Sequence, residues 1–453
     1  MPSFSSWLFL GVVLAALLDA FGVPFAGNAA IGALALFIVL EVRRVAWPQL
    51  LIAGALLTAG IVAATSAGAP AGTMAKGLKN SLPFLVLFGA VAWLNVPASE
   101  SRSLRAARDA VAGQPPGWRF ATLAVAAHLL GSVFNLVAVS LLSVLIGHQD
   151  EPAIRRRLAR ALLQGFATAT CWSPLFVGPA VILAVLPEAR WVTIAPFGVG
   201  LALLLLALAW GADRAFNPAR APLGTPGTPL PAWAVRRIAL LVGVLLMLAM
   251  GLVEATGLSM PMALGLIAPP FAAVGQAARQ RESRREAAEA LAAVAQMAGR
   301  VARGFETLRT ETLMFSAANI FSAGIARIVP EAEAQAALAR LGLGPDGLIV
   351  VLALGLVMAS AMGLHPVIVV MLIGQVLPPE AFGLPASLLA LILMALWGMG
   401  TNASPFSATN IIMSRVVGMG HWAIAWRWNL PFSLAGAGVV ALAGIVLRRV
   451  AMG

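Results

Sequence analysis

Apolar runs of about 20 residues recur along the chain, and an α-helix needs about this length to cross the hydrocarbon core of a bilayer. Of the 453 residues, 60% are hydrophobic and 11% are charged. Backbone N–H and C=O groups find no water inside a bilayer, so each apolar run has to satisfy its own hydrogen bonds as a helix. The sequence therefore predicts an all-α polytopic membrane protein.

The charged residues are distributed as in a membrane protein. The net charge of +12 comes from arginines in short segments between apolar runs, rather than from one basic groove. This distribution is typical of cytoplasmic loops, and it disfavours a soluble enzyme or a nucleic-acid-binding protein. The single cysteine, Cys171, excludes an internal disulfide, and four scattered histidines predict neither a metal site nor a bound cofactor.

Two polar segments inside apolar runs resemble each other. The sequence ATATCWSPLFVGPAVIL begins at residue 167, and GTNASPFSATNIIMS begins at residue 400. Ser173-Pro174 in the first aligns with Ser404-Pro405 in the second, at an offset of 231 residues. The match predicts an internal repeat of the chain.

A second pair of segments lies upstream at the same spacing. GSVFNLVAVSLLSVLIG (131–147) aligns with SAMGLHPVIVVMLIGQV (360–376), which brings Asn135 opposite His365 at an offset of 230. Two matches at a common offset favour the repeat. The alternative is that any two helices rich in Ala, Leu and Val look alike.

The segment 120–147 cannot be a simple crossing. Lys and Arg collect in short cytoplasmic loops, yet arginines lie on both sides of this segment, at Arg119 before it and from Arg155 after it. A re-entrant hairpin that enters from the cytoplasm and turns near Gly131 and Asn135 resolves the conflict. Turns at membrane depth are tolerated where protein encloses them, often around a wet cavity.

The matching segment in the second half, 348–377, is expected to enter from outside and to turn near His365. The residues that follow it, LPPEAFGLP, contain no Lys or Arg, as an external position predicts. The stretch 279–303 carries six arginines and a helical period of alanines, which suggests an amphipathic cytoplasmic surface helix.

The full prediction is about 11 transmembrane helices plus two re-entrant hairpins in an inverted-topology repeat. Each half holds five crossings and one hairpin, and an odd number of crossings inverts the second copy, as in secondary transporters. The N-terminus is expected to be cytoplasmic, and the first apolar run lacks a basic start and is read as a retained helix. The predicted parts are an N-terminal transmembrane helix (1–27), a first repeat (28–212, hairpin about 120–147), a cytoplasmic linker (213–237) and a second repeat (238–453, hairpin about 348–377).

This order of spans, hairpins and Pro-containing breaks resembles the ion transporter superfamily, which includes divalent anion:sodium symporters and citrate, arsenite and sodium/proton carriers. In the symporter branch, Ser-Asn-Thr signatures at the hairpin tips and helix breaks hold sodium and an anionic substrate. The tips of this chain read SVFN from Ser132 and SAMGLH from Ser360, so neither tip carries that signature intact.

The residues that would carry chemistry lie at the tips and the breaks. Pro405 removes a backbone donor and Gly398 and Gly400 loosen the helix, so a discontinuity is expected near Thr401 to Ser404. A broken helix exposes carbonyls that suit a small cation and N–H groups that suit an anion. The candidate substrate- or ion-binding residues are Ser132, Asn135, Thr168, Thr170, Ser173, His365, Thr401, Asn402, Ser404, Ser407 and Asn410.

Alternatives stay open for individual residues. A single Ser or Thr commonly bonds back to its own helix or joins neighbouring helices. Asn135 could be a ligand or a helix-packing amide. His365 could bind an anion or pass a proton, or it could be a neutral ring bonded to a carbonyl. Asn319 could line the same cavity or permit close helix packing.

No carboxylate falls in the expected midplane site, which disfavours a sodium/proton antiporter and a cationic substrate. The sequence therefore predicts a secondary active transporter, not an enzyme, that moves a small organic or inorganic anion across the cell inner membrane with Na⁺ or H⁺ by alternating access. The alternative is a membrane enzyme or exporter acting on lipid-linked or amphipathic substrates. The expected partners are a small-molecule anion and the lipid bilayer, with no nucleic acid; a homodimer is left open.

Overall fold

The computed structural model describes residues 2–99, 101–147, 149–217, 232–282 and 287–452, and these residues form helices without any strand. They divide into two compact units, each of which is described by itself. Unit 1 comprises residues 1–100, 243–334 and 371–377, and unit 2 comprises residues 101–242, 335–370 and 378–453. The boundary falls within three helices, which are α11 (Ala232–Thr256), α15 (Glu331–Arg340) and α17 (Pro366–Val376).

Eight helices in the described part of the chain are long and apolar enough to cross a membrane. The chain therefore has the helices of a multi-pass membrane protein. Three of the roughly 11 expected crossings do not meet this test. The first, α1 (Phe4–Ala20), has 17 residues, the second is interrupted between Thr168 and Val177, and the third lies in a helix pair bent by 86°.

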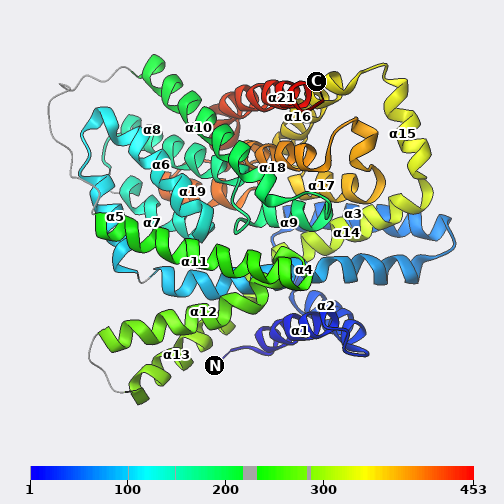
Figure 1. The fold of residues 1–453 in the computed structure, drawn as a ribbon, viewed down its shortest axis with the longest axis horizontal. Helices are drawn as coiled ribbons and strands as arrows, with labels where there is room; N and C mark the ends of the chain where they lie inside the picture. The colour runs from blue at the N-terminus through cyan, green and yellow to red at the C-terminus, as the bar shows by residue number, and fades with distance from the viewer. Residues whose placement is uncertain (1, 100, 148, 218–231, 283–286, 453) are drawn as a thin grey trace. The chain divides into compact units, whose positions relative to one another are not determined.

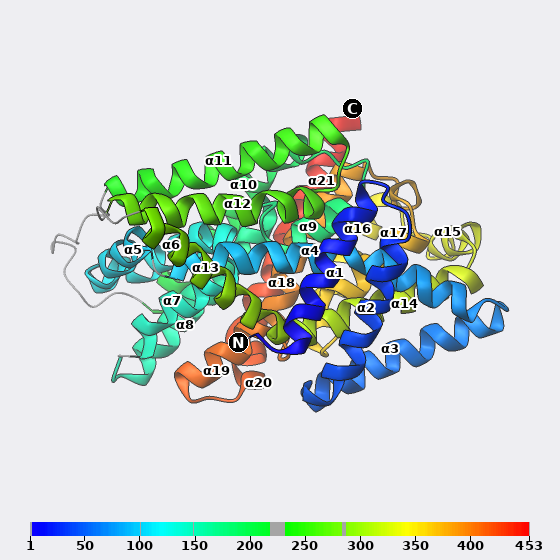
Figure 2. The ribbon, with the colours of Figure 1, turned by 90° about the horizontal axis from the view of Figure 1, so that it is seen from below.

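Unit 1 is built from long helices that pack side by side (Figures 1 and 2). Besides α1, its helices are α2 (Ala26–Glu41), η1 (Val42–Arg44), α3 (Trp47–Ser66), α4 (Pro70–Ser99), α12 (Met260–Glu282), α13 (Ala287–Gly304), η3 (Phe305–Leu308) and α14 (Arg309–Ile328). Helix α4 is the longest of these, because the polar residues at its start continue the same helix as the apolar ones that follow.

Glycines let three helices of unit 1 approach closely. Gly60 of α3 lies against the backbone of Phe321 in α14, and Gly77 of α4 lies against Ile320 of the same helix. A Cβ atom at either glycine would come within 2.8 Å of these atoms, which no ordinary contact allows. Close approach through small residues is how helices associate without a hydrophobic driving force in lipid.

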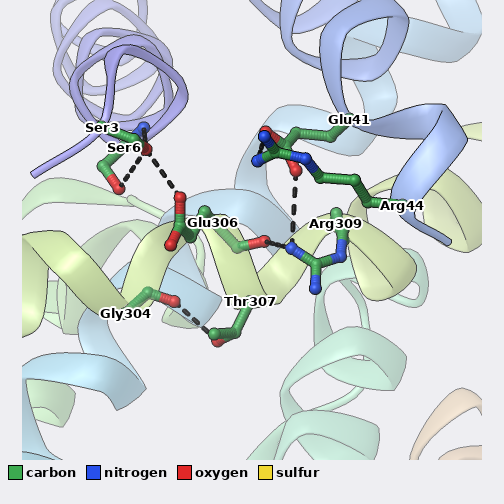
Figure 3. A network of polar contacts seen from close by, with 8 residues as sticks. All are labelled: Ser3, Ser6, Glu41, Arg44, Gly304, Glu306, Thr307 and Arg309. Atoms are coloured by element: carbon green, nitrogen blue, oxygen red, sulfur yellow. Dashed lines mark hydrogen bonds and ion pairs between the residues drawn. The ribbon is translucent and has the colours of Figure 1, made fainter.

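A polar network joins α2, η1, η3 and α14 to the N-cap of α1 at one end of unit 1 (Figure 3). The Glu41 carboxylate is 2% exposed and accepts from Arg44 at 3.2 Å and from Arg309 at 3.5 Å. The Ser3 hydroxyl donates to Glu306 at 2.7 Å. A buried carboxylate needs such partners, so this network fixes the end of α2 against η3 and α14.

Unit 2 contains one complete helical hairpin, the tip of a second hairpin and two interrupted helices. Its elements in the first half are α5 (Arg102–Ala112), α6 (Pro116–Phe134), α7 (Leu136–Gly147), α8 (Pro152–Thr168), η2 (Ala169–Cys171), α9 (Val177–Val185) and α10 (Trp191–Phe216). Those in the second half are α16 (Pro345–Ala361), the start of α17, η4 (Pro379–Phe382), α18 (Ala386–Ala403), α19 (Ala408–Val417), α20 (His421–Ala423), a π-helix η5 (Ile424–Asn429) and α21 (Leu430–Met452). The apolar helix α18 is the most buried of the membrane-length segments.

Polar and aromatic contacts join the ends of the helices in unit 2. Arg157 of α8 makes a bidentate ion pair with Asp213 of α10, whose carboxylate is fully buried. At the start of α16, Asp346 pairs with Arg448 at 2.7 Å and with Arg449 at 2.6 Å. The start of the second hairpin and the end of α21 therefore lie at the same end of unit 2.

Two predicted segments differ from the structure or fall outside it. Most of the linker predicted at 213–237 lies outside the described residues, while α10 continues to Phe216 and α11 starts at Ala232. Of the surface helix expected at 279–303, residues up to Glu282 belong to α12 and residues from Ala287 belong to α13, and residues 283–286 lie outside the described residues.

Candidate functional site

Two helices of unit 2 are interrupted at the same short motif. Helix α18 ends at Ala403 and α19 starts at Ala408, with Ser404-Pro405 in the gap. The earlier interruption, with Ser173-Pro174, follows η2 and ends at Val177. Proline has no N–H to continue the helical ladder, which explains both breaks. The predicted discontinuity is confirmed, but it begins at Ser404, and Thr401 and Asn402 remain helical.

The tip of the first hairpin is hydrogen-bonded to the first break. Asn135, between α6 and α7, has a φ of 48° and is one of two non-glycine residues with positive φ in the described chain. Its Nδ2 donates to the Leu175 carbonyl at 3.1 Å, and its Oδ1 accepts from the Val177 N–H at 3.4 Å. The Ser173 hydroxyl donates to the Ser132 carbonyl. Asn135 thus pairs with both a backbone carbonyl and a backbone N–H that the break leaves without a helical partner.

A histidine that the sequence analysis did not select lies beside this break. Trp172 Nε1 donates to His128 Nε2 at 3.1 Å, and His128 Nδ1 is 2.9 Å from the Thr168 hydroxyl. Because Nε2 accepts, a neutral ring carries its proton on Nδ1 and donates it to Thr168, which in turn donates to the Gly165 carbonyl at 2.7 Å. The sequence did contain a pattern that could have identified His128, because it precedes Asn135 by seven residues, which is close to two helical turns.

The second break is satisfied by its own asparagine. Asn410 Nδ2 donates to the Asn402 carbonyl at 3.0 Å and to the Ser404 carbonyl at 2.8 Å. At the other side of the gap, the Ser407 hydroxyl accepts from the Asn410 N–H at 3.3 Å and caps α19. The Asn410 amide therefore donates hydrogen bonds to carbonyls that were expected to bind a cation.

Two further polar residues complete this cluster, and neither was predicted from the sequence. Asn402 Nδ2 donates to Ser433 at 3.3 Å, and Asn429 Nδ2 donates to Asn410 Oδ1 at 3.4 Å. All four side chains are at most 2% exposed, and Asn429 Oδ1 has no partner in the described residues. Asn429 ends the π-helix η5, a rare conformation that occurs frequently at functional sites.

The tip of the second hairpin uses a different set of contacts. Gly363 has a φ of 107° and lies against the Phe406 ring of the break. His365 Nδ1 accepts from the Val367 N–H at 3.2 Å, and the His365 ring meets the Trp397 ring edge-on at 5.5 Å. His365 thus bonds within its own tip and packs on α18.

The two interrupted helices meet close to their breaks. A Cβ at Gly398 of α18 would collide with the Ala167 carbonyl and the Thr170 hydroxyl, and Gly178 of α9 lies against the Trp397 ring. The remaining predicted threonines bond within their own helices, Thr170 to Ala167 and Thr401 to Trp397 and Gly398. These two follow the alternative reading of threonine in membrane helices.

Of the predicted residues, one group gathers at the first break (Ser132, Asn135, Thr168 and Ser173) and another at the second (Asn402, Ser404, Ser407 and Asn410). Asn319 lies in unit 1 and donates to Phe315 at 3.0 Å. The segments 161–187 and 381–414, which contain the breaks, hold no Asp, Glu, Lys or Arg. No group of three or more His, Cys, Asp or Glu that could hold a metal occurs among the described residues.

A half-exposed aromatic cluster lies next to the second break. The Phe406 and Trp422 rings are 5.3 Å apart, and the Trp422 and Trp426 rings are 4.9 Å apart. Trp426 Nε1 donates to the Ala361 carbonyl at the end of α16. The cluster offers flat apolar surface beside a polar site.

No protein-family model and no curated protein matches this chain. Among solved structures, the YdaH transporter from Alcanivorax borkumensis is similar, with a TM-score of 0.51 and 14% sequence identity over 81% of this chain and 85% of that chain. That structure is described as having an unusual topology. The chain shares the fold of a membrane transporter.

Proposed function

We propose that this protein is a secondary active transporter that moves a small organic or inorganic anion across the inner membrane, coupled to Na⁺ or H⁺, by alternating access. The observation that carries the proposal is the pair of interrupted helices in unit 2, each with a hairpin tip packed against its break. Interrupted helices around a midplane site are the recurring device of secondary transporters, and the transporter fold is consistent with it.

The contacts inside unit 1 support the inverted repeat. In the proposed repeat, α3 is equivalent to α12 and α4 is equivalent to α14. The contact between α3 and α14 is then equivalent to the contact between α12 and α4. Both pairs are among the most extensive helix contacts of the protein. We infer that the two halves face opposite sides of the membrane, with the N-terminus in the cytoplasm and the hairpins re-entrant from opposite faces.

The separation into two units supports alternating access. Unit 2 contains both breaks and both hairpin tips, while unit 1 contains the early helices of each half. In this proposal, unit 2 carries the site and unit 1 is the scaffold, where a homodimer would form.

The chemistry of the breaks supports an anionic substrate. Neither break holds a charged side chain, and α9 and α19 both start at a break with the positive end of their dipoles. A cation would meet no fixed counter-charge, whereas an anion would be attracted by both helix starts. The Asn410 amide donates to the carbonyls of Asn402 and Ser404, so a sodium ion that binds these carbonyls would have to displace the amide.

The alternative substrate class is amphipathic. The aromatic cluster of Phe406, Trp422 and Trp426 favours an exporter of amphipathic molecules over an enzyme acting on lipid-linked ones, since it provides stacking surface without a charged reactive group.

The test is a thermal-unfolding screen of the purified protein with succinate, citrate, sulfate and phosphate, each with and without sodium, followed by uptake of the stabilising anion into proteoliposomes. Specific binding raises the unfolding temperature by mass action. We expect Asn402→Ala and Ser404→Ala to reduce uptake at least about tenfold. The first removes the buried amide that donates to Ser433, and the second removes a buried hydroxyl at the break.

The matched control is Ser66→Ala, which removes an exposed hydroxyl that bonds within α3. It should transport like the parent protein. Normal uptake by both site variants would refute the assignment of the site, and stabilisation by amphipathic aromatic compounds alone would favour the exporter.

A further inference from the structure

A cavity lies at the base of the first hairpin, away from its tip. It is lined by residues from helices α5, α6, α7 and α8 of unit 2 and from the turn after α7, namely Val111, Arg119, Leu123, Leu145, Gln149 and Leu158. Leu123 precedes the tip residue Asn135 by twelve positions, which is roughly 18 Å along a helix. The cavity is therefore separate from the breaks.

The lining of the cavity is apolar except for one amide and one guanidinium. Arg119 Nε donates to the Gln114 carbonyl at 2.7 Å, which fixes the side chain, and its two Nη atoms have no partner in the described residues. Arg155 closes the adjacent turn by donating to the Gln149 carbonyl at 2.7 Å. Such a lining fits a molecule with one anionic group and an apolar chain.

The surroundings have the features of a membrane interface. Residues 101–160 contain eight arginines and three acidic residues. Helix α5 is amphipathic, with Val111 buried and Arg102 and Arg105 exposed. Trp118, at the start of α6, is 48% exposed and stacks on Trp210 at 5.9 Å. Basic residues and tryptophans at this density are typical of the headgroup region of a bilayer.

We propose that this cavity binds an anionic phospholipid, with the headgroup phosphate on Arg119 and the first part of an acyl chain against Leu123, Leu145 and Leu158. Arginine is well suited to phosphate because it presents paired donors in a fixed plane. Since the cavity walls come from both helices of the hairpin and from α5 and α8, the lipid holds the hairpin base together and stabilises unit 2.

The experiment is thermal unfolding of the full-length protein in detergent, with mixed micelles containing either phosphatidylglycerol or phosphatidylcholine, and with inorganic phosphate in a separate arm. We expect phosphatidylglycerol to raise the unfolding temperature by about 3 °C or more, with little change from the other two. Arg119→Gln should weaken the response to phosphatidylglycerol about tenfold or more in concentration. Arg43→Gln removes an exposed positive charge in unit 1 and should keep the full response.

Leu145→Trp is the second variant, because it fills the apolar part of the cavity and leaves the Arg119 to Gln114 bond in place. It should lose the response to phosphatidylglycerol even if Arg119→Gln proves too unstable to measure. Equal stabilisation by the two lipids, or an unchanged response in Leu145→Trp, would overturn the proposal. Stabilisation by inorganic phosphate that equals that of phosphatidylglycerol would assign the site to a free anion instead.

Discussion

The two hairpins of unit 2 hold their breaks in different ways. The first tip is tied to its break by hydrogen bonds, with Asn135 bonding to both sides of the gap and Ser173 bonding back to the tip. The second tip meets its break through an apolar contact, in which Gly363 lies against the Phe406 ring. No hydrogen bond joins residues 362–365 to residues 404–407 in the described structure.

This difference shows which tip moves at lower cost. Releasing the first tip would leave a buried amide and backbone groups without partners, and such groups cost about 1–3 kcal/mol each. Releasing the second tip separates Gly363 from the Phe406 ring and breaks one hydrogen bond, from the exposed Trp426 ring to the Ala361 carbonyl, while its break remains satisfied internally by Asn410 and Ser407. In the proposed transporter, the first hairpin would therefore stay fixed and the second would be the one to move.

The largest effect is expected for Asn135→Ala. We expect the free energy of unfolding to fall by about 3 kcal/mol, because two buried hydrogen bonds are lost and alanine tolerates a positive φ poorly. Chemical denaturation of the purified protein measures this. Asn135→Gly is the control, because glycine accepts the backbone conformation and isolates the loss of the amide.

If Asn135→Ala unfolds like the parent protein, the first tip is not held by its amide, and the contrast between the hairpins fails.

A smaller effect is expected at the second tip for Gly363→Ala. A Cβ there would lie 2.8 Å from the Phe406 ring at a φ of 107°, so we expect a loss of about 1–2 kcal/mol. Adding Phe406→Ala should recover part of this loss by removing the clash, which a double-mutant cycle in denaturation measures. Strict additivity of the two changes would show that the tip does not rest on the ring.

The smallest effect concerns the bases of the two hairpins in acid. Hydrogen bonds from Arg449 and Arg448 lower the pKa of Asp346, so its contribution to stability is present above the ordinary aspartate pKa and is lost as the pH falls through the lowered value. At the base of the first hairpin, Arg155 instead donates to the Gln149 carbonyl, which does not titrate. We therefore expect only the base of the second hairpin to loosen below about pH 4.

Hydrogen exchange of residues 345–361 between pH 6 and pH 3 measures this loosening, and Asp346→Asn should remove its pH dependence. Loosening that persists in Asp346→Asn would assign the acid response to another group.

The sequence predicted the breaks because their cause is local. Ser-Pro inside an apolar run removes a helix donor wherever it occurs, and both breaks lie at the motif. The turn at Asn135 was also predicted, because arginines lie on both sides of its segment, and the turn near Gly363 was predicted within a few residues from the alignment of the two segments.

The contacts at the breaks could not be predicted, because they join residues far apart in the chain. His128 pairs with Trp172, and Asn402 with Ser433, across 44 and 31 residues. Helix α15 was also missed, since an acidic helix outside the apolar runs has no hydropathy signal. Single-sequence patterns indicate which residues are unusual, and only the packing shows what they bond.

The most direct test of the inverted repeat is cysteine labelling at the two hairpin bases in intact cells. In a Cys171→Ala background, Asp150→Cys and Gly344→Cys each place one exposed thiol at a base. With a membrane-impermeant maleimide, we predict that residue 344 is labelled in intact cells and that residue 150 is labelled only after permeabilisation. Labelling of both positions from the same side would contradict two hairpins that enter from opposite faces.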